Sequence, residues 1–235
     1  KKHRPERIII EYNGMWNFKE MKLPANWQIE QQITTIDAST FVMYFANMKS
    51  LLAEMLRASD MIIFNRCDGI QDLSSYKRNV KAINQQAEII FEDANGEVNS
   101  IMEDELPYDL KQDTLELDNT GYGIFYLDAL DHGERYEGKE LVFTAMVLKP
   151  KGFPGDYFVP GRMAMTCCVD DMAFLGFACE YDGAGALRER DWVRVRAVMH
   201  REYWADYGGE GPVLHAVSVK PCQAPDEEII DFSRM

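Results

Sequence analysis

The chain has 235 residues, of which 46% are hydrophobic and 27% charged, and its formal net charge is −14. This size and apolar content suit a globular protein of one or two domains with a real core. No apolar run approaches the roughly 18–20 residues of a membrane helix, and the acidic balance argues against nonspecific nucleic-acid binding because it repels phosphate backbones.

The negative charge is concentrated in the second half of the chain. Residues 1–112 hold 13 Lys and Arg against 17 Asp and Glu, whereas residues 113–235 hold 12 against 22. Five cysteines without a framework spacing argue against a disulfide-stapled secreted protein. We therefore expect a soluble cytoplasmic protein that is not inserted in a membrane. The chain opens at Lys1 without an initiator Met, and we interpret this start as a cut end.

Strand and helix patterns alternate over the first hundred residues. Short apolar runs predict strands at 8–10, 32–37, 61–64 and 87–91. Ser39 is placed to cap a helix whose apolar positions recur at helical spacing as far as Leu56, and a second helix is expected at 73–84. This alternation predicts a parallel sheet with helices packed on it.

The pattern changes after an acidic, proline-containing stretch. We expect a domain at 1–102, a linker at 103–121 and a second domain at 122–235. After a short helix near 126–130, strands are predicted at 140–148, 156–166, 173–180, 192–200 and 212–219. Five short strands separated by glycine-rich turns predict a small all-β barrel of the oligonucleotide-binding kind.

The motif Asn65-Arg66-Cys67-Asp68 directly follows the predicted strand at 61–64. A guanine base offers a ring nitrogen and a carbonyl to an amide, and two N–H donors to a carboxylate. Asn65 and Asp68 are spaced to meet both edges, while Arg66 stands where the N-K-x-D motif has lysine. The alternative is a polar turn after a strand. The exchange of lysine for arginine leaves the base specificity open.

A second motif, Glu11-Tyr12-Asn13-Gly14, follows the first predicted strand. With the segments ITTIDAS and SDMIIFNRCD, it resembles the CobW-type GTPases over about residues 7–100. This resemblance implies a P-loop-GTPase-like α/β domain in a family linked to metal homeostasis. It also implies that Asn65 and Asp68 bind guanine, and that Glu11 and Gly14 face the γ-phosphate and Mg²⁺.

Two features of that family do not occur in the chain. No G-x-x-x-x-G-K-[ST] loop and no Cys-x-Cys-Cys motif occurs in the sequence. Backbone amides and a lysine around the phosphates supply most of the nucleotide's binding. We therefore expect GTP and Mg²⁺ to bind only together with an upstream P-loop segment, and we expect no hydrolysis by this chain alone.

In the second half, the segment RMAMTCCVDDMAFLGF resembles a domain of unknown function in permease subunits of the YcgQ type. The resemblance covers about residues 122–228, and Arg162, Cys167, Cys168 and Asp170 fall on its R-x-x-x-x-C-C-x-x-D pattern. Thiolates with a carboxylate could form a zinc or copper site. Because adjacent residues of a strand point to opposite faces, the alternative is that these cysteines are small core residues.

Tyr203, Trp204 and Tyr207 lie near a glycine-rich turn of the predicted barrel. Such a cluster is typical of a barrel rim or a subunit contact, and less so of a ligand-binding face.

Three hypotheses for function follow. The first is that the chain is part of a CobW-like GTP-binding protein that acts in metal homeostasis or delivery. Its barrel would contact a metal, a metalloprotein client or a permease subunit. The second is a non-catalytic scaffold with a degenerate G domain. The third, a single-strand nucleic-acid binder, is opposed by the acidity of the chain.

Overall fold

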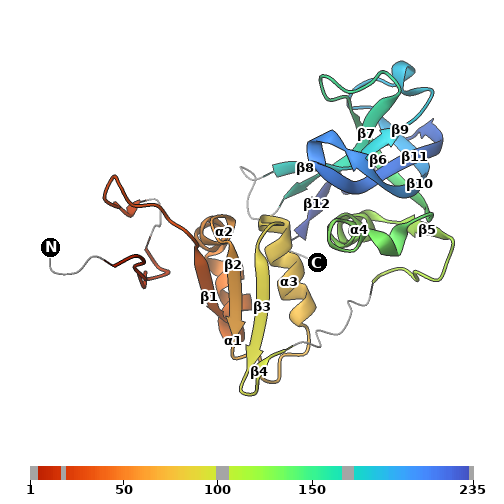
Figure 1. The fold of residues 1–235 in the computed structure, drawn as a ribbon. Coiled ribbons are helices and arrows are strands. Elements are labelled where there is room, and N and C mark those ends of the chain that lie inside the picture. The colour runs from red at the N-terminus through yellow and green to blue at the C-terminus, as the bar shows by residue number, and fades with distance from the viewer. Residues whose placement is uncertain (1–4, 17–19, 99–105, 166–171, 233–235) are drawn as a thin grey trace. The chain divides into compact units, whose positions relative to one another are not determined.

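The computed structural model describes residues 5–16, 20–98, 106–165 and 172–232. The chain divides into two compact units, one of residues 1–71 and 86–99, the other of residues 72–85 and 100–235. Each unit has its own sheet (Figure 1). Within the described ranges, no helix is both long and apolar enough to cross a bilayer.

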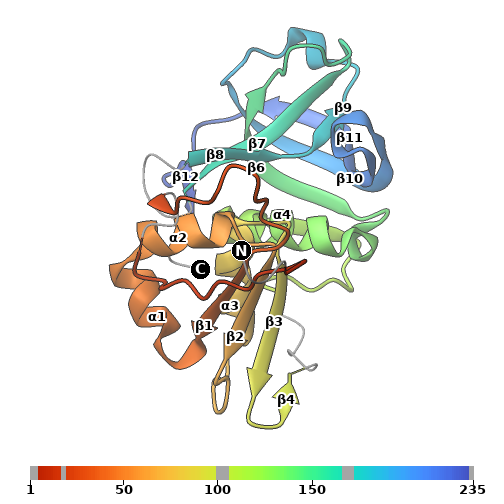
Figure 2. The same cartoon turned by 60° about the vertical axis from the view of Figure 1, so that its left-hand side comes forward.

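The sheet of the first unit has four strands in the order β1-β2-β3-β4. The strands are β1 (Ile33–Asp37), β2 (Met61–Asn65), β3 (Glu88–Asp93) and β4 (Gly96–Glu97). The first three run parallel, side by side in Figure 2, and β4 is antiparallel to β3. The predicted parallel sheet at 32–37, 61–64 and 87–91 is therefore confirmed, with a short antiparallel strand added.

Two helices connect β1 to β2, where one was predicted. They are α1 (Ala38–Asn47) and α2 (Lys49–Arg57), separated at Met48, whose φ of −131° and ψ of 33° are not helical. The cap is Asp37 and not the predicted Ser39: the Asp37 side chain accepts from Ser39 N at 3.0 Å. Aspartate is a strong N-cap because its carboxylate accepts from a free N–H of the first turn.

Aromatic side chains form the centre of the first unit's core. Phe41 of α1 meets Phe64 of β2 edge to face at 5.0 Å between ring centroids. Phe64 stacks on Phe91 of β3 at 4.9 Å. Each of these three side chains is at most 1% exposed, so α1 is held on this face of the sheet by direct ring contacts.

The predicted strand at 8–10 is wrong. Ile8, Ile9 and Ile10 form no strand and are 49%, 98% and 48% exposed. A parallel strand is stable when a neighbour pairs with its backbone and both faces are covered, and among the described residues β1 pairs only with β2. A run of three apolar residues does not by itself provide those partners.

The second unit contains a closed five-stranded barrel. Its strands pair in the cyclic order β6-β7-β9-β11-β10 and back to β6. They are β6 (Glu140–Leu148), β7 (Tyr157–Met165), β9 (Ala178–Glu180), β10 (Trp192–Trp204) and β11 (Gly209–Pro221). Closure leaves no free edge in the ring, and the predicted small β-barrel is confirmed.

Further elements surround the barrel. The helices are α3 (Leu73–Ile83) and α4 (Asn119–Asp131), with a 3₁₀ turn at Gly133–Tyr136, and α3 contacts α4. The strands are β5 (Thr114–Leu117) on β6, β8 (Met172–Gly176) on β7, and β12 (Ile229–Asp231) on β7. The structure thus places a strand and the start of a helix inside the predicted linker at 103–121. The predicted strand at 173–180 is two strands, β8 and β9.

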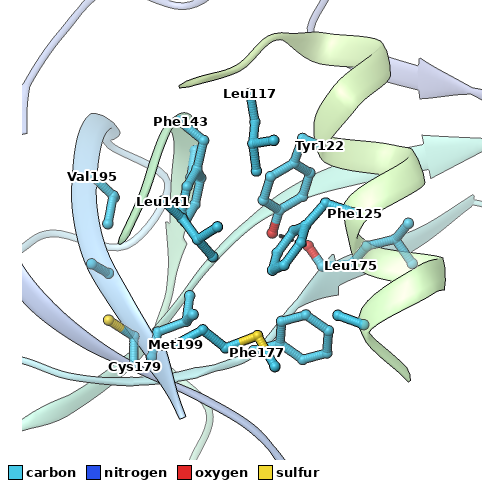
Figure 3. Close-up of a cluster of buried hydrophobic side chains, with 14 of the residues drawn as sticks. Leu117, Tyr122, Phe125, Leu141, Phe143, Leu175, Phe177, Cys179, Val195 and Met199 are labelled. Carbon is cyan, nitrogen blue, oxygen red and sulfur yellow. Dashed lines mark hydrogen bonds between the residues drawn. The ribbon is translucent and has the colours of Figure 1, made fainter. Parts of the chain in front are cut away.

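The barrel and α4 enclose one apolar core (Figure 3). On β10, Val193, Val195, Ala197 and Met199 are at most 1% exposed, whereas the residues between them are more exposed. This two-residue alternation is what a strand with one buried face requires. From α4, Tyr122 and Phe125 point into the same core, and the ring centroids of Tyr122 and Phe143 of β6 are 5.0 Å apart.

A hydrogen-bonded network joins α4 to the turn that follows it. The Tyr136 hydroxyl, in a side chain that is 0% exposed, donates to Asp128 at 2.7 Å and lies 2.9 Å from the Tyr108 hydroxyl. Arg135 pairs with the same Asp128 carboxylate at 3.2 Å. Burial and the neighbouring Tyr108 and Asp128 raise the pKa of Tyr136, so this phenol stays protonated and donates.

We expect Tyr136→Phe to lower the free energy of unfolding by about 1–3 kcal/mol, because it leaves buried partners without a hydrogen bond. Urea unfolding followed by circular dichroism measures the change. The matched control is Tyr203→Phe, whose side chain is 71% exposed, with an expected change within about 0.5 kcal/mol. Equal stabilities of the two variants would contradict the structural role of the network.

Candidate functional site

The motif at 65–68 lies at the carboxyl end of β2, the middle strand of the three parallel ones. Asn65 ends β2 and is paired in register with Asp37, which ends β1. The segment then turns toward the end of β3, where Cys67 N donates to Glu92 O at 3.0 Å. In open α/β sheets, ligands bind outside the carboxyl ends of the strands, so the motif occupies the expected position for a ligand site.

Each motif residue has a distinct environment. The Asp68 side chain is exposed, and its Oδ1 accepts from Ala94 N at 3.2 Å, which ties the loop after β2 to the loop after β3. Cys67 is 4% exposed, and burial raises the pKa of its thiol. The buried cysteine packs the loop from within, and the carboxylate of Asp68 remains accessible to a ligand.

Arg66 makes an ion pair that the sequence did not suggest. Its Nη1 lies 2.5 Å from Asp37 Oδ2, and its backbone φ is +56°. The Ser39 hydroxyl and the Arg66 guanidinium together hold the pKa of Asp37 below its ordinary value. Asp37 therefore caps α1 and fixes the Arg66 side chain at once. The only sequence signal for this role was an aspartate at a strand end with a serine two residues later.

Glu11 and Gly14 are exposed and precede the sheet in irregular structure. A Cβ at Gly14 would lie 3.7 Å from Met55 Sδ of α2. Met55 is in the last turn of α2, which leads into the amino end of β2. Gly14 is therefore placed at the opposite end of β2 from Asn65, and the structure does not bring these two motifs together. The roles of Glu11 and Gly14 toward Mg²⁺ stay a prediction.

Asn65 carries an amide with an NH₂ donor and an Oδ1 acceptor. Its Oδ1 is buried and, within the described parts of the chain, accepts no hydrogen bond. A guanine ring nitrogen and carbonyl would accept from the NH₂ group of this amide, so the buried oxygen is not the atom that would meet the base. The amide and the Asp68 carboxylate together offer donors and acceptors of the kind that a guanine edge requires.

The predicted metal ligands Cys167, Cys168 and Asp170 lie outside the described residues. Among the residues that are described, no group of three or more His, Cys, Asp or Glu is arranged to hold a metal ion. A metal at Cys167, Cys168 and Asp170 therefore stays a prediction.

Arg162, from the same predicted pattern, is only 2% exposed. Its Nη2 donates to the carbonyl of Glu227, and its guanidinium lies 5.2 Å from the Trp192 ring. Burial lowers the pKa of this guanidinium. Arg162 thus connects β7 to the segment that enters β12, 65 residues further along the chain.

Comparison with known families identifies both halves of the chain. Residues 92–230 match the family described as the DUF1980 C-terminal domain. Residues 1–91 match the CobW/HypB/UreG nucleotide-binding domain, which contains the motif at 65–68. Both resemblances expected from the sequence are confirmed. No curated protein matches the chain.

The conformation of Arg66 leads to a stability prediction. Arg66 has a backbone φ of +56°, a conformation that is strained for residues with a Cβ and unstrained for glycine. We expect Arg66→Gly to be more stable than Arg66→Ala by about 1 kcal/mol, because both lose the exposed ion pair and only glycine relieves the strain. Thermal unfolding of the two variants measures the difference. If alanine is as stable as glycine, the left-handed conformation is contradicted.

Proposed function

Because the chain belongs to the family described as the DUF1980 C-terminal domain, with a CobW-type nucleotide-binding match before it, we propose that it is part of a CobW-like GTP-binding protein. Its role would be metal homeostasis or metal delivery. In this proposal the first unit recognises guanine, and the barrel contacts a metal, a metalloprotein client or a permease subunit.

The observation that carries the proposal is the position of Asn65 and Asp68 at the carboxyl end of a parallel strand. This edge is where nucleotides bind in open α/β sheets. The amide of Asn65 can donate to a guanine ring nitrogen or carbonyl, and the Asp68 carboxylate is exposed and accepts from Ala94 N. Such preorganised polar groups limit the entropy that base binding would cost.

The phosphates need groups that this chain does not contain. Its sequence has no P-loop, and backbone amides with a lysine supply most of the phosphate binding in such proteins. We therefore propose that GTP and Mg²⁺ bind only where a P-loop completes the site. Base recognition is the contribution of Asn65 and Asp68, and hydrolysis is not a property of this chain alone.

A second function is a non-catalytic interaction module. The observation that favours it is the placement of Gly14 beside Met55, at the opposite end of β2 from the base motif. In that arrangement Gly14 does not reach a phosphate of a base-bound nucleotide. The first unit would then present the barrel to a partner without any nucleotide chemistry.

A titration with fluorescent GTP and ATP analogues in the presence of Mg²⁺ tests the first proposal. It is made on this chain and on the longest product of its gene. We expect guanine-selective binding by the longest product, and a loss of about tenfold or more in affinity for Asp68→Ala, because a charged hydrogen bond to the base is removed.

The matched control is Glu97→Ala, which removes an exposed carboxylate of β4 in the same unit. It should leave the affinity unchanged. Equal binding of both nucleotides, or equal losses in the two variants, would refute guanine recognition by this motif. No binding by either protein would favour the interaction module.

A further inference from the structure

Two rows of side chains cross three strands of the barrel, one row in the core and the other on the outer surface. Phe158, Cys179 and Leu214 are in register on β7, β9 and β11, and each is at most 1% exposed in the core. Their chain neighbours Tyr157, Glu180 and His215 are also in register. Since successive strand residues point to opposite faces, this second row lies on the outer surface.

Carboxylates surround the histidine of this row. His215 Nδ1 lies 2.9 Å from Glu180, and His215 Nε2 lies 2.7 Å from Glu202 of β10. A glutamate carboxylate from a different strand therefore lies beside each ring nitrogen of His215. Two residues before Glu202 on β10, His200 Nδ1 lies 2.8 Å from a carboxylate oxygen of Glu137.

Aromatic rings lie directly beside these charges. The centroid of the Trp204 ring lies 5.0 Å from that of Tyr157 and 5.1 Å from that of Phe153. Burial, followed by the negative charges of Glu180, Glu202 and Asp156, raises the pKa of Tyr157. The three rings and the carboxylates thus form one surface, which we call the aromatic–acidic face: Phe153, Asp156, Tyr157, Glu180, Glu202, Trp204 and His215.

The charges of this face are not balanced. Its named residues include three carboxylates, Glu180, Glu202 and Asp156, and no Lys or Arg. The imbalance extends to the whole barrel half of the chain, where residues 113–235 carry 12 Lys and Arg against 22 Asp and Glu. An aromatic ring beside carboxylates attracts a cation both by its quadrupole and by direct charge pairing.

We propose that the aromatic–acidic face docks a basic segment of a partner protein. An arginine or lysine side chain of that segment lies against the Trp204 and Tyr157 rings and pairs with Glu180 and Glu202. The inference names the chemistry of the barrel's partner, and it rests on the proposed function only for the existence of such a partner.

Charge complementarity selects this occupant over others. A second copy of the chain would bring another strongly acidic barrel to the face and be repelled. Nucleic acid is disfavoured for the same reason. Within the described residues, the side chains of the face are not arranged as a three-ligand metal site. A basic peptide satisfies both the rings and the carboxylates.

Fluorescence anisotropy with a fluorescein-labelled peptide of four Arg-Gly repeats tests the proposal, at about 150 mM salt, where long-range attraction is screened. A peptide with glutamine in place of arginine is the reference. We expect selective binding of the arginine peptide, and a loss of about five- to tenfold for the double variant Glu180→Gln, Glu202→Gln.

The matched control is the double variant Glu189→Gln, Asp226→Asn, which removes the same charge from two exposed positions outside the face. It should change the affinity less than twofold. Trp204→Leu, with its fold checked by circular dichroism, should weaken binding about threefold or more through the lost cation–π contact.

Equal weakening by the two double variants would overturn the proposal, since net charge alone would then explain the binding. A lack of preference for arginine over glutamine would overturn it as well. The assay contains no nucleotide, so its failure is separate from a failure of guanine recognition by the first unit.

Discussion

The two-residue period of strand side chains, together with the pairing register, is the constraint on which both units depend. On β10 it sends Val195 and Met199 into the barrel core and His200 and Glu202 to the surface. A shift of one residue would exchange these sets, expose the core and bury the charges. The apolar core therefore fixes the register, and the register in turn decides which polar groups meet on the outside.

In the parallel sheet of the first unit, the pairing register aligns the carboxyl ends of neighbouring strands. Its strands end at a common edge, and this brings Asp37 beside Asn65 and the loop of Asp68 beside Ala94. Polar groups that are distant in the chain gather at this edge without entering the core. The proposed base recognition uses this strand edge, whereas the proposed docking of a basic segment uses the outer surface of the barrel.

Several elements could be predicted because their signals are local. The apolar runs of β2 and β6 and the helical pattern of α3 appear in the structure within about two residues. The errors arose where the outcome depends on distant partners. The apolar residues of 8–10 lack a neighbouring strand among the described residues, whereas β12 pairs with residues 163–165 of β7, beyond the part of β7 that pairs with β6. Neither relation is visible in a local window of sequence.

The sequence by itself determined the candidate base motif, the acidic balance and the division into an α/β part and a barrel, because residue identity and local periodicity carry these properties. Only the tertiary structure decided that Asp37 holds Arg66, that Gly14 lies away from Asn65, and that His215 stands between two glutamates of other strands. The physical reason is that such contacts join residues far apart in the chain. They form only when packing of the core has set the strand order and register.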